Sequence, residues 1–348
     1  MPMGNGRRAQ LVLQDARAFG EEFAVPGGER RLDLQEGYLE EKHLLGADGL
    51  RLRFGRQELV YGEERLVGTF GYNNVGRTYD AVKLRWDREG AWHEAFVSRV
   101  VHDPLAPSQQ SLWGSYNSFD LGGARVLEAY VLRKLDPRAA VRQDRFTYGL
   151  HSRGPLSGGF DYGLEADFQR GDWGASSIDA WAYHSELGYA LGDRRKTRLV
   201  LEVNQASGDG NPADSTVRTF DNLYPTNHYL YGIADLFAWQ NMGELRLGVA
   251  TDVGPRLRGS LDFHRFTLQD VRDNWYRANR KLFRAGDPTG LASDDAGDEW
   301  DLQLKFQWQK DRVLELGASH FSPGDNLRGR GLPADDADLV YLQTLFNF

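Results

Sequence analysis

Basic side chains at alternate positions of two neighbouring segments are the residues of this sequence best suited to bind a ligand. Arg51 and Arg53 follow a glycine-containing turn, and Lys83 and Arg85 lie in the next segment of the same pattern. Large apolar residues alternate with them, as in a β-strand whose two faces differ. The cations of each segment therefore share one face. Because ladders of Arg and Lys favour anionic solutes, this face is predicted to attract anions.

Further segments place polar residues on the same kind of face. An acidic set is formed by Asp161, Glu165 and Asp167. If the face lines a water-filled lumen, a basic wall opposite an acidic wall creates a transverse field, and ladders of Arg and Lys favour anionic solutes. The alternative is that inward charges neutralise each other in pairs and only keep a wet wall polar. The other residues predicted to face inward are Gln57, Arg198, Arg246, Arg258 and Lys305.

The segment Trp300–Trp308 shows what such alternation would build. Every even position is large and apolar, with Trp at both ends, and every odd position is polar. At about 3.3 Å per residue and a tilt of about 40°, the segment rises about 20 Å, close to the ~25 Å lipid-facing band between two aromatic girdles. It is therefore predicted to be a membrane-spanning strand; a sandwich strand with one face on a core is the alternative.

Composition agrees with strands and turns. The chain has 348 residues, with 40 Gly, 18 Phe, 15 Tyr and 9 Trp but only 3 Met. No run of eighteen apolar residues occurs, which excludes transmembrane helices. The absence of Cys excludes disulfides and thiolate metal sites. A net charge of −8 argues against a nucleic-acid partner.

Alternating segments recur along the whole chain. We predict about sixteen strands, within a range of 14–18, in one antiparallel up-and-down transmembrane β-barrel that forms a single domain over residues 1–348. Residues 1–7 are expected to be disordered or the remnant of a missing first hairpin. The predicted strands are Arg8–Phe19, Leu32–Leu44, Leu50–Val60, Thr78–Trp86, Trp92–Val101, Leu112–Leu121, Ala124–Leu135, Asp144–His151, Gly159–Gln169, Ile178–Tyr189, Thr197–Ala206, Glu244–Thr251, Leu257–Phe266, Trp300–Trp308, Val313–Phe321 and Leu339–Phe348.

Connection length alternates between the predicted strands. Short turns alternate with longer connections such as Tyr61–Arg77, Gly208–Asn241 and Thr267–Glu299. Two of the latter, Asp136–Arg142 and Gly171–Ser177, are only moderate in length. Short periplasmic turns and long extracellular loops are typical of outer-membrane barrels. The chain also ends on Phe348, which resembles the signal by which bacterial barrel proteins are delivered to their assembly machinery.

Three motifs carry a family resemblance. Gly55-Arg56-Gln57-Glu58-Leu59 is followed by Arg65-Leu66-Val67-Gly68 and by Gly76-Arg77-Thr78-Tyr79-Asp80. Thr219–His228 and His320–Asp325 complete the set. Together they resemble the bacterial alginate-export outer-membrane porin family. The resemblance implies an outer-membrane channel with a basic, narrowed pore for a polyuronate.

The resemblance also makes Arg56, Arg65 and Arg77 candidates to line or brace a constriction. The alternative is that they pin the loop 61–77 by pairing with its glutamates. Strict alternation places Arg56 outward, so a lumenal Arg56 needs a β-bulge near Gly55. The aromatic loop Gly208–Asn241 is expected either to fold into the pore or to pack on the rim.

Other chemistries lack a pattern. The eight His residues show no HExxH spacing, and no GxSxG, P-loop or dinucleotide fingerprint is present. We therefore predict no enzyme activity, no cofactor and no metal, with calcium at Ser293–Glu299 as a minor alternative to a solvated acidic loop.

The sequence thus predicts a monomeric channel in the outer membrane of a Gram-negative bacterium. It would pass an anionic polysaccharide such as alginate, or smaller anionic solutes, by passive diffusion. The alternatives are a general small-molecule uptake porin and, from another class, a soluble β-rich polysaccharide-binding protein or lyase.

Overall fold

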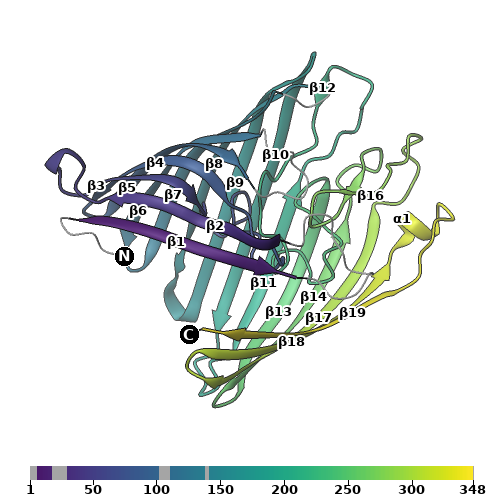
Figure 1. Cartoon of the computed structure of the whole chain (residues 1–348). Coiled ribbons are helices and arrows are strands. Elements are labelled where there is room, and N and C mark those ends of the chain that lie inside the picture. Colours follow the sequence, from purple (N-terminus) through teal and green to yellow (C-terminus); the bar gives the residue numbers. More distant parts are fainter. Residues whose placement is uncertain (1–5, 18–29, 102–109, 138–140, 348) are drawn as a thin grey trace.

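Sixteen long strands, each antiparallel to the next along the chain, form the main sheet of the molecule (Figure 1). The computed structural model describes residues 6–17, 30–101, 110–137 and 141–347. Its main sheet has 17 strands, of which the two-residue β12 (Thr216–Val217) pairs in parallel with β10. The long strands are β1 (Arg7–Ala16), β2 (Arg30–Glu41), β3 (Leu50–Gln57), β4 (Tyr79–Arg88), β5 (Ala91–Val100), β6 (Ser111–Gly122), β7 (Arg125–Asp136), β8 (Gln143–Pro155), β9 (Phe160–Trp173), β10 (Ser176–Ala190), β11 (Arg198–Ala206), β13 (Met242–Gly254), β14 (Leu257–Thr267), β17 (Asp295–Gln309), β18 (Arg312–Pro323) and β19 (Ala337–Phe346).

Each predicted segment coincides with one long strand, because alternation along the chain corresponds to two unlike faces of the sheet. In β9, Leu164 and Phe168 are 47% and 54% exposed, whereas Glu165 and Asp167 are 6% and 0% exposed. The same inversion recurs around the sheet. A surface of this kind is suited to lipid outside and a polar interior. Exposed apolar residues of the outer face include Phe54, Val82, Leu84, Trp86, Leu199, Leu201, Leu245, Leu247, Leu261, Trp300, Leu302, Phe306 and Trp308.

The connections follow the predicted alternation with one correction. The moderate connection expected at Gly171–Ser177 is a tight hairpin, because β9 continues to Trp173 and pairs there with Ser176 of β10. The longer connections contain small elements that periodicity did not reveal. These are the hairpin β15 (Trp275–Tyr276) and β16 (Leu282–Arg284) and the helix α1 (Asp325–Arg328). Two further short elements, the turns η1 (Leu44–Gly46) and η2 (Ser157–Gly159), belong to short connections on the opposite rim.

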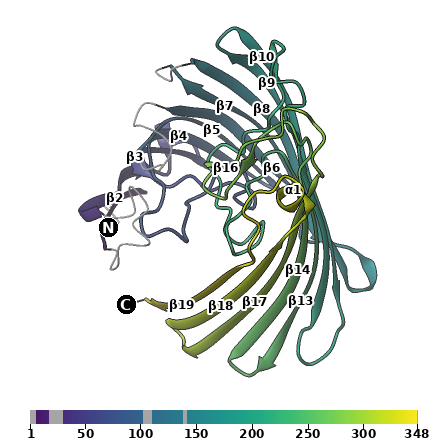
Figure 2. The ribbon, with the colours of Figure 1, turned by 90° about the vertical axis from the view of Figure 1, so that its right-hand side faces the viewer.

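The sheet curls strongly around the loops that it carries (Figure 2). Hydrogen-bonded registers connect every neighbouring pair from β1–β2 to β18–β19, and none joins β1 to β19 among the described residues. β1 begins at Arg7, while residues 1–5 and the terminal Phe348 lie outside the described residues. No helix in the described part of the chain is long and apolar enough to cross a membrane.

The hydrophobic core lies on the inner face of the sheet. It forms where apolar loop residues meet the few aromatic side chains that the strands direct inward. Tyr61, Phe220, Tyr231 and Trp239 of the loops are buried there together with Phe266 of β14. Packing of these loops against the wall therefore defines what remains open inside the sheet.

Candidate functional site

Two connections fold inward and pair with each other. We call residues 58–78, between β3 and β4, the first inner loop, and residues 207–241, between β11 and β13, the second inner loop. Val67 and Tyr224 form a parallel bridge. The Gly68 N–H donates to the Tyr224 carbonyl at 2.9 Å, and the Tyr224 N–H donates to the Leu66 carbonyl at 2.8 Å. The two loops are therefore one unit, and the second folds into the sheet, as one of the two sequence expectations stated.

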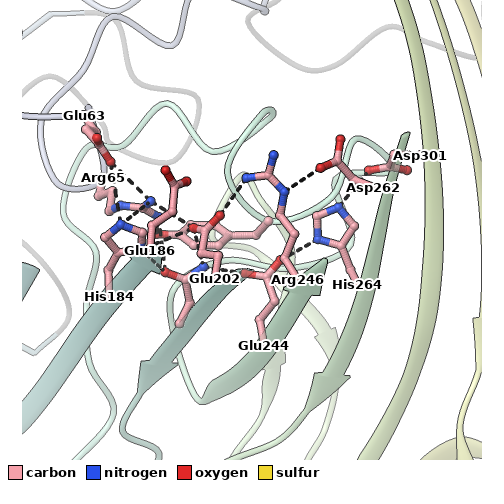
Figure 3. A network of polar contacts seen from close by, with 12 residues as sticks. Glu63, Arg65, His184, Glu186, Glu202, Glu244, Arg246, Asp262, His264 and Asp301 are labelled. Atoms are coloured by element: carbon pink, nitrogen blue, oxygen red, sulfur yellow. Dashed lines mark hydrogen bonds and ion pairs between the residues drawn. The ribbon is translucent and has the colours of Figure 1, made fainter. Parts of the chain in front are cut away.

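Arg65 anchors the first inner loop to the opposite wall (Figure 3). Its guanidinium lies 3.0 Å from Glu202 of β11, 3.3 Å from Glu63 and 3.8 Å from Glu165 of β9. Arg65 and Glu202 are both almost fully buried. Burial raises the pKa of the Glu63 carboxyl, but the charge of Arg65 outweighs it and holds that pKa below its usual value. Arg65 thus braces the loop rather than presenting a free cation.

His184 of β10 completes this anchor. Its Nε2 lies 3.2 Å from the Arg65 guanidinium and its Nδ1 lies 2.8 Å from Asn204 Oδ1. A guanidinium can only donate, so in the neutral ring Nε2 accepts and Nδ1 carries the proton toward Asn204. The buried side chains of three strands are in this way oriented around one arginine.

Arg77 braces the junction between the loops. Its guanidinium donates to the carbonyls of Gly68, Tyr224 and Pro225 at 3.3, 2.5 and 2.9 Å. The expected pairing of the loop arginines with loop glutamates therefore holds for Arg65 with Glu63, whereas Arg77 binds backbone of both inner loops. Gln57, predicted to line the pore, is also buried, and its amide donates to the Ala81 carbonyl at 3.2 Å.

A second group of charged side chains, which includes His264 and Asp301 in Figure 3, holds another part of the second inner loop. Asp301 of β17 accepts a hydrogen bond from the Ile233 N–H, and Glu299 accepts one from the Ala234 N–H, both at 2.9 Å. His264 of β14 links this pair to the wall, since Asp301 lies 3.4 Å from its Nε2. Carboxylates of the sheet therefore receive loop amides that would otherwise be buried without partners.

The predicted basic wall assembles as expected. Arg51 stands opposite Arg85 and Arg53 opposite Lys83 in the register of β3 and β4. These four cations line a recess of about 90 Å³ together with Glu40 and Glu94. Like charges directly opposite each other destabilise a sheet. Two such pairs therefore need nearby counter-charges on the inner face.

Carboxylates that the sequence analysis did not single out balance this wall. Arg53 lies 2.5 Å from Glu40, Lys83 3.5 Å from Glu94, and Arg85 2.9 Å from Asp87, which Arg51 also contacts. The pairing alternative thus describes the wall better than two opposed fields of unlike sign. Alternation could not place Glu94, because apolar residues occupy both faces of β5: Phe96 and Val100 are buried on the side of Glu94, whereas Val97 is exposed on the other side.

The acidic set is divided by the inner loops. Asp161 lies 3.0 Å from Arg198 Nε, near the short-turn rim. Glu165 and Asp167 are buried and accept hydrogen bonds from the Tyr130 hydroxyl at 2.6 and 2.8 Å. Both are therefore covered instead of facing open lumen, and Glu165 also lies 3.8 Å from Arg65 of the first inner loop.

The remaining predicted residues occupy three different places. Arg246 of β13 bridges Glu202 at 2.6 Å and Asp262 at 2.8 Å within the network of Figure 3. Lys305 lies 3.2 Å from Glu315 on the inner face of β17. Arg258 pairs with Asp252 at 2.9 Å close to the short-turn rim.

Arg56 does not lie in the lumenal position that was predicted for it. The registers of β3 with β2 and β4 run without a shift from Leu52 to Arg56, so the required bulge does not form. Arg56 consequently shares the face of Phe54 and pairs with Asp80 at 2.9 Å.

A second cationic cluster was missed. Lys134 of β7, Arg145 of β8 and Arg280 surround Asp221 of the second inner loop, at 2.5, 3.9 and 4.0 Å. Burial raises the pKa of the Asp221 carboxyl, but the three cations outweigh it and hold that pKa well below its usual value. The inward positions of Lys134 and Arg145 follow from alternation, whereas nothing in the sequence placed Arg280 beside them.

The acidic segment Ser293–Glu299 uses its carboxylates in protein contacts. Asp295 and Asp298 lie 3.4 and 3.5 Å from Arg265, and Glu299 accepts the loop amide described above. Among the described residues, no group of three or more His, Asp or Glu side chains is arranged to hold a metal ion.

An apolar outer face, a polar inner wall and inward-folded loops define an outer-membrane porin, and comparison with known proteins agrees with this class. A family model described as alginate export matches residues 2–337, and the chain belongs to that family. It is a protein of the Gram-negative outer membrane. The family resemblance drawn from the three motifs is thereby confirmed.

Solved porins share the fold at low sequence identity. Pseudomonas aeruginosa OccD3 (OpdP) is 13% identical with a TM-score of 0.60, over 91% of this chain and 78% of that one. P. aeruginosa OccK2 (OpdF), solved in complex with glucuronate, is 15% identical with a TM-score of 0.57, over 91% and 82%. Acinetobacter baumannii OccAB1 is 13% identical with a TM-score of 0.57, over 89% and 76%. No curated protein matches the chain in a sequence search.

Proposed function

We propose that the chain closes into a β-barrel and passes carboxylate-bearing anions, uronates and alginate among them, by passive diffusion. One observation carries the proposal: in several inner ion pairs the cation is more exposed than its carboxylate. Arg53 and Glu40 are 25% and 5% exposed, Lys305 and Glu315 are 49% and 10%, and Arg246 and Glu202 are 22% and 1%. A solute inside the sheet would therefore meet guanidinium and ammonium groups first, although each pair is close to neutral.

The chemistry of these groups favours carboxylates over other anions. Arginine offers two parallel N–H donors that match the two oxygens of a carboxylate. Each exposed cation is already satisfied in part by its own carboxylate, so a passing solute would exchange partners and be bound weakly. Weak binding at several sites is what conduction requires. The related porin solved with glucuronate supports a carboxylated sugar as solute.

Closure of the barrel follows from the surroundings we propose. The outer face of the sheet is apolar, and a sheet edge in lipid leaves backbone groups without hydrogen bonds at a cost of several kcal/mol each. The strong curl of the sheet supports the same arrangement (Figure 2). We propose a monomer without enzymatic activity that is inserted by the barrel-assembly machinery through its C-terminal strand.

Single-channel recording tests this function directly. The purified full chain is inserted into a planar bilayer, its reversal potential is measured in a salt gradient, and oligouronate is added as a blocker. Anion selectivity with block by uronate is the expected result. A cation-selective channel that ignores uronate would overturn the proposed solute and favour a general porin. A protein that stays monodisperse in water without detergent would overturn the channel itself.

A further inference from the structure

A pocket remains where both inner loops meet the connection between β15 and β16. Its volume is about 360 Å³. The first inner loop contributes residues 70 and 72–74, the second contributes residues 228 and 234–236, and the β15–β16 connection contributes residues 277–279. All three segments belong to connections on the rim opposite the short turns. The pocket is therefore built by segments that enter from the proposed extracellular side.

Hydrogen bonds hold the three segments together around the pocket. The Phe70 N–H donates to Thr226 Oγ1 at 2.8 Å, which joins the two inner loops. The Ala278 N–H donates to the Asp235 carbonyl at 3.2 Å, and Asn227 Nδ2 donates to the Ala278 carbonyl at 2.6 Å. The pocket is thus preformed, and a ligand need not order the loops in order to bind.

Two hydrogen-bond acceptors in the lining have no partner within the described part of the chain. His228 is 3% exposed, and its Nδ1 lies 3.0 Å from Asp235 Oδ2. A carboxylate only accepts, so Nδ1 carries the proton and Nε2 of the neutral ring is an acceptor. Neither His228 Nε2 nor Asp235 Oδ1 receives a hydrogen bond. Because buried polar atoms normally have partners, these two acceptors are suited to a ligand that brings hydrogen-bond donors.

Two side-chain amides of the lining supply donors. The oxygens of Asn73 and Asn279 accept from the N–H groups of Asn74 and Lys281 at 2.9 and 3.0 Å. Their amide nitrogens form no hydrogen bond with any described residue and remain available to donate. A hydroxyl group both donates and accepts. A lining that offers acceptors together with donors therefore suits a ligand rich in hydroxyl groups.

Aromatic rings form another part of the lining. The rings of Tyr72 and His228 are stacked with 3.3 Å between their centroids, so only the other face or the edge of Tyr72 is left for a ligand. Flat apolar faces of this kind pack against the C–H groups of a sugar ring. The volume is at the small end of the ~300–1,000 Å³ typical of ligand pockets, which suits one ring rather than a chain.

The charges of this lining differ from those of the basic wall. Of the described residues that line the pocket, Asp235 brings a carboxylate and Arg277 a guanidinium, and these charges offset each other. The recess between β3 and β4 instead has four cations and two carboxylates. The pocket is therefore suited to the hydroxyl groups that neutral and carboxylated sugars share, whereas the basic wall is suited to carboxylates.

We infer that this pocket is a binding subsite for one sugar ring, recognised through its hydroxyl groups. Asp235 and His228 accept hydrogen bonds from these hydroxyls, and the amides of Asn73 and Asn279 donate to them. Tyr72 packs against the apolar face of the ring. The inference rests on the proposed function, because the channel would bring the sugar to the pocket.

Ligand-observed NMR on the full chain, purified in a sugar-free detergent, tests the subsite. Saturation transfer is titrated with methyl β-D-glucopyranoside and with tetrahydropyran, a ring of the same size without hydroxyl groups. We expect the glucoside to bind at least tenfold more tightly than tetrahydropyran, because the hydroxyl groups carry the recognition.

Two substitutions remove the proposed acceptors one at a time. Asp235→Asn should weaken glucoside binding about tenfold, the effect of losing a hydrogen bond to a charged group. His228→Phe keeps a ring against Tyr72 but removes Nε2, and should weaken binding about fivefold. Asp252→Asn changes an aspartate that is ion-paired with Arg258 near the opposite rim. It is the matched control and should bind the glucoside as the native chain does.

The outcomes separate the subsite from the channel. Unchanged glucoside binding by both Asp235→Asn and His228→Phe would overturn the subsite, as would equal binding of the glucoside and tetrahydropyran. The Asp235 side chain is 39% exposed, so its substitution is expected to leave the fold intact. Asp235→Asn decides alone if His228→Phe loses its heat-modifiable mobility on a gel.

The two proposals can also fail independently of each other. An anion-selective channel that does not bind the glucoside would keep the proposed function and overturn the subsite. Glucoside binding that depends on Asp235 in a cation-selective channel would keep the subsite and overturn the proposed solute.

Discussion

Arg65 and Glu202 form an ion pair of 3.0 Å between residues 137 positions apart in the chain, and both side chains are almost fully buried. One partner belongs to a loop and the other to the wall of the sheet. The pair therefore sets how far the first inner loop reaches into the space that the sheet encloses. Because Val67 of that loop bridges to Tyr224, the same contact also determines the place of the second inner loop.

Replacing Arg65 should release the inner loops and widen the channel. Removing one partner of a buried ion pair costs about 3–5 kcal/mol, because the other charge stays buried without compensation. We expect Arg65→Met to raise single-channel conductance and its fluctuations, and Arg65→Lys to give an intermediate effect, since an ammonium keeps the charge but not the planar fork.

Arg56→Met is the control for that substitution. Arg56 lies on the outer side of β3, and within the described part of the chain its hydrogen bonds go to Asp80 and the Leu34 carbonyl, neither of which belongs to an inner loop. Equal conductance in Arg65→Met and Arg56→Met would show that Arg65 does not hold the constriction.

Arg51→Gln should lower anion selectivity at little cost in stability. Asp87 keeps its second partner, Arg85, and the repulsion between Arg51 and Arg85 across the strands disappears. Cross-strand pairs contribute about 0.2–1 kcal/mol, so the free energy of unfolding should stay unchanged or rise by that amount. Reversal potentials and urea unfolding measure the two effects. If Arg51→Gln lowered the free energy of unfolding by several kcal/mol and left anion selectivity unchanged, Arg51 would serve to stabilise the fold and not to select anions.

The strands were predictable from sequence because a sheet between lipid and a polar interior imposes strict alternation on every strand. Trp300 and Trp308 are exposed on the outer face while Asp301 between them is buried, as alternation requires. The same rule correctly grouped Arg51, Arg53, Lys83 and Arg85 and identified the outward parity of Arg56. A lumenal Arg56 needed a bulge that departs from the rule, and that bulge does not form.

The loops could not be predicted in this way, since no periodicity governs them. Sequence singled out Arg65 and Arg77 but left open whether they line a constriction or pin the loop through its glutamates. Their partners, Glu202 and the carbonyls of Tyr224 and Pro225, are remote in the chain and depend on how two long loops fold onto one wall. The position of Arg280 beside Asp221 is of the same kind. Only the folded chain brings it near Lys134 and Arg145.

Acid should release the inner loops. The pKa values of Asp221 and Glu63 are lower in the folded chain than in an unfolded one. Their ionised forms therefore stabilise loop docking at pH values above about 4, the pKa of such a carboxyl in an unfolded chain. This stabilisation is lost as the pH falls toward and through the lower pKa that each carboxyl has in the folded chain. We expect conductance to be constant between about pH 5 and 8 and to rise below about pH 4.

Limited proteolysis of the inner loops at several pH values gives a second measurement of this release. Asp221→Asn lacks one of the two titrating groups, so its loops should be cleaved more readily at neutral pH and show a smaller change on acidification. An identical acid profile in this variant would contradict a role for Asp221.

Arginine scanning of β17 distinguishes the lipid face from the lumen. Leu304 lies midway between Trp300 and Trp308 on the outer face, and Gln303 points inward, where its amide donates to the Tyr341 hydroxyl at 3.2 Å. An arginine on the lipid face at mid-depth costs about 2–4 kcal/mol, whereas an inward arginine can be hydrated. We therefore expect Leu304→Arg to lower the free energy of unfolding in lipid vesicles by that amount and Gln303→Arg to change it little. Urea titration followed by tryptophan fluorescence provides the comparison. Equal tolerance at the two positions would reject the assignment of faces on which the lumenal set depends.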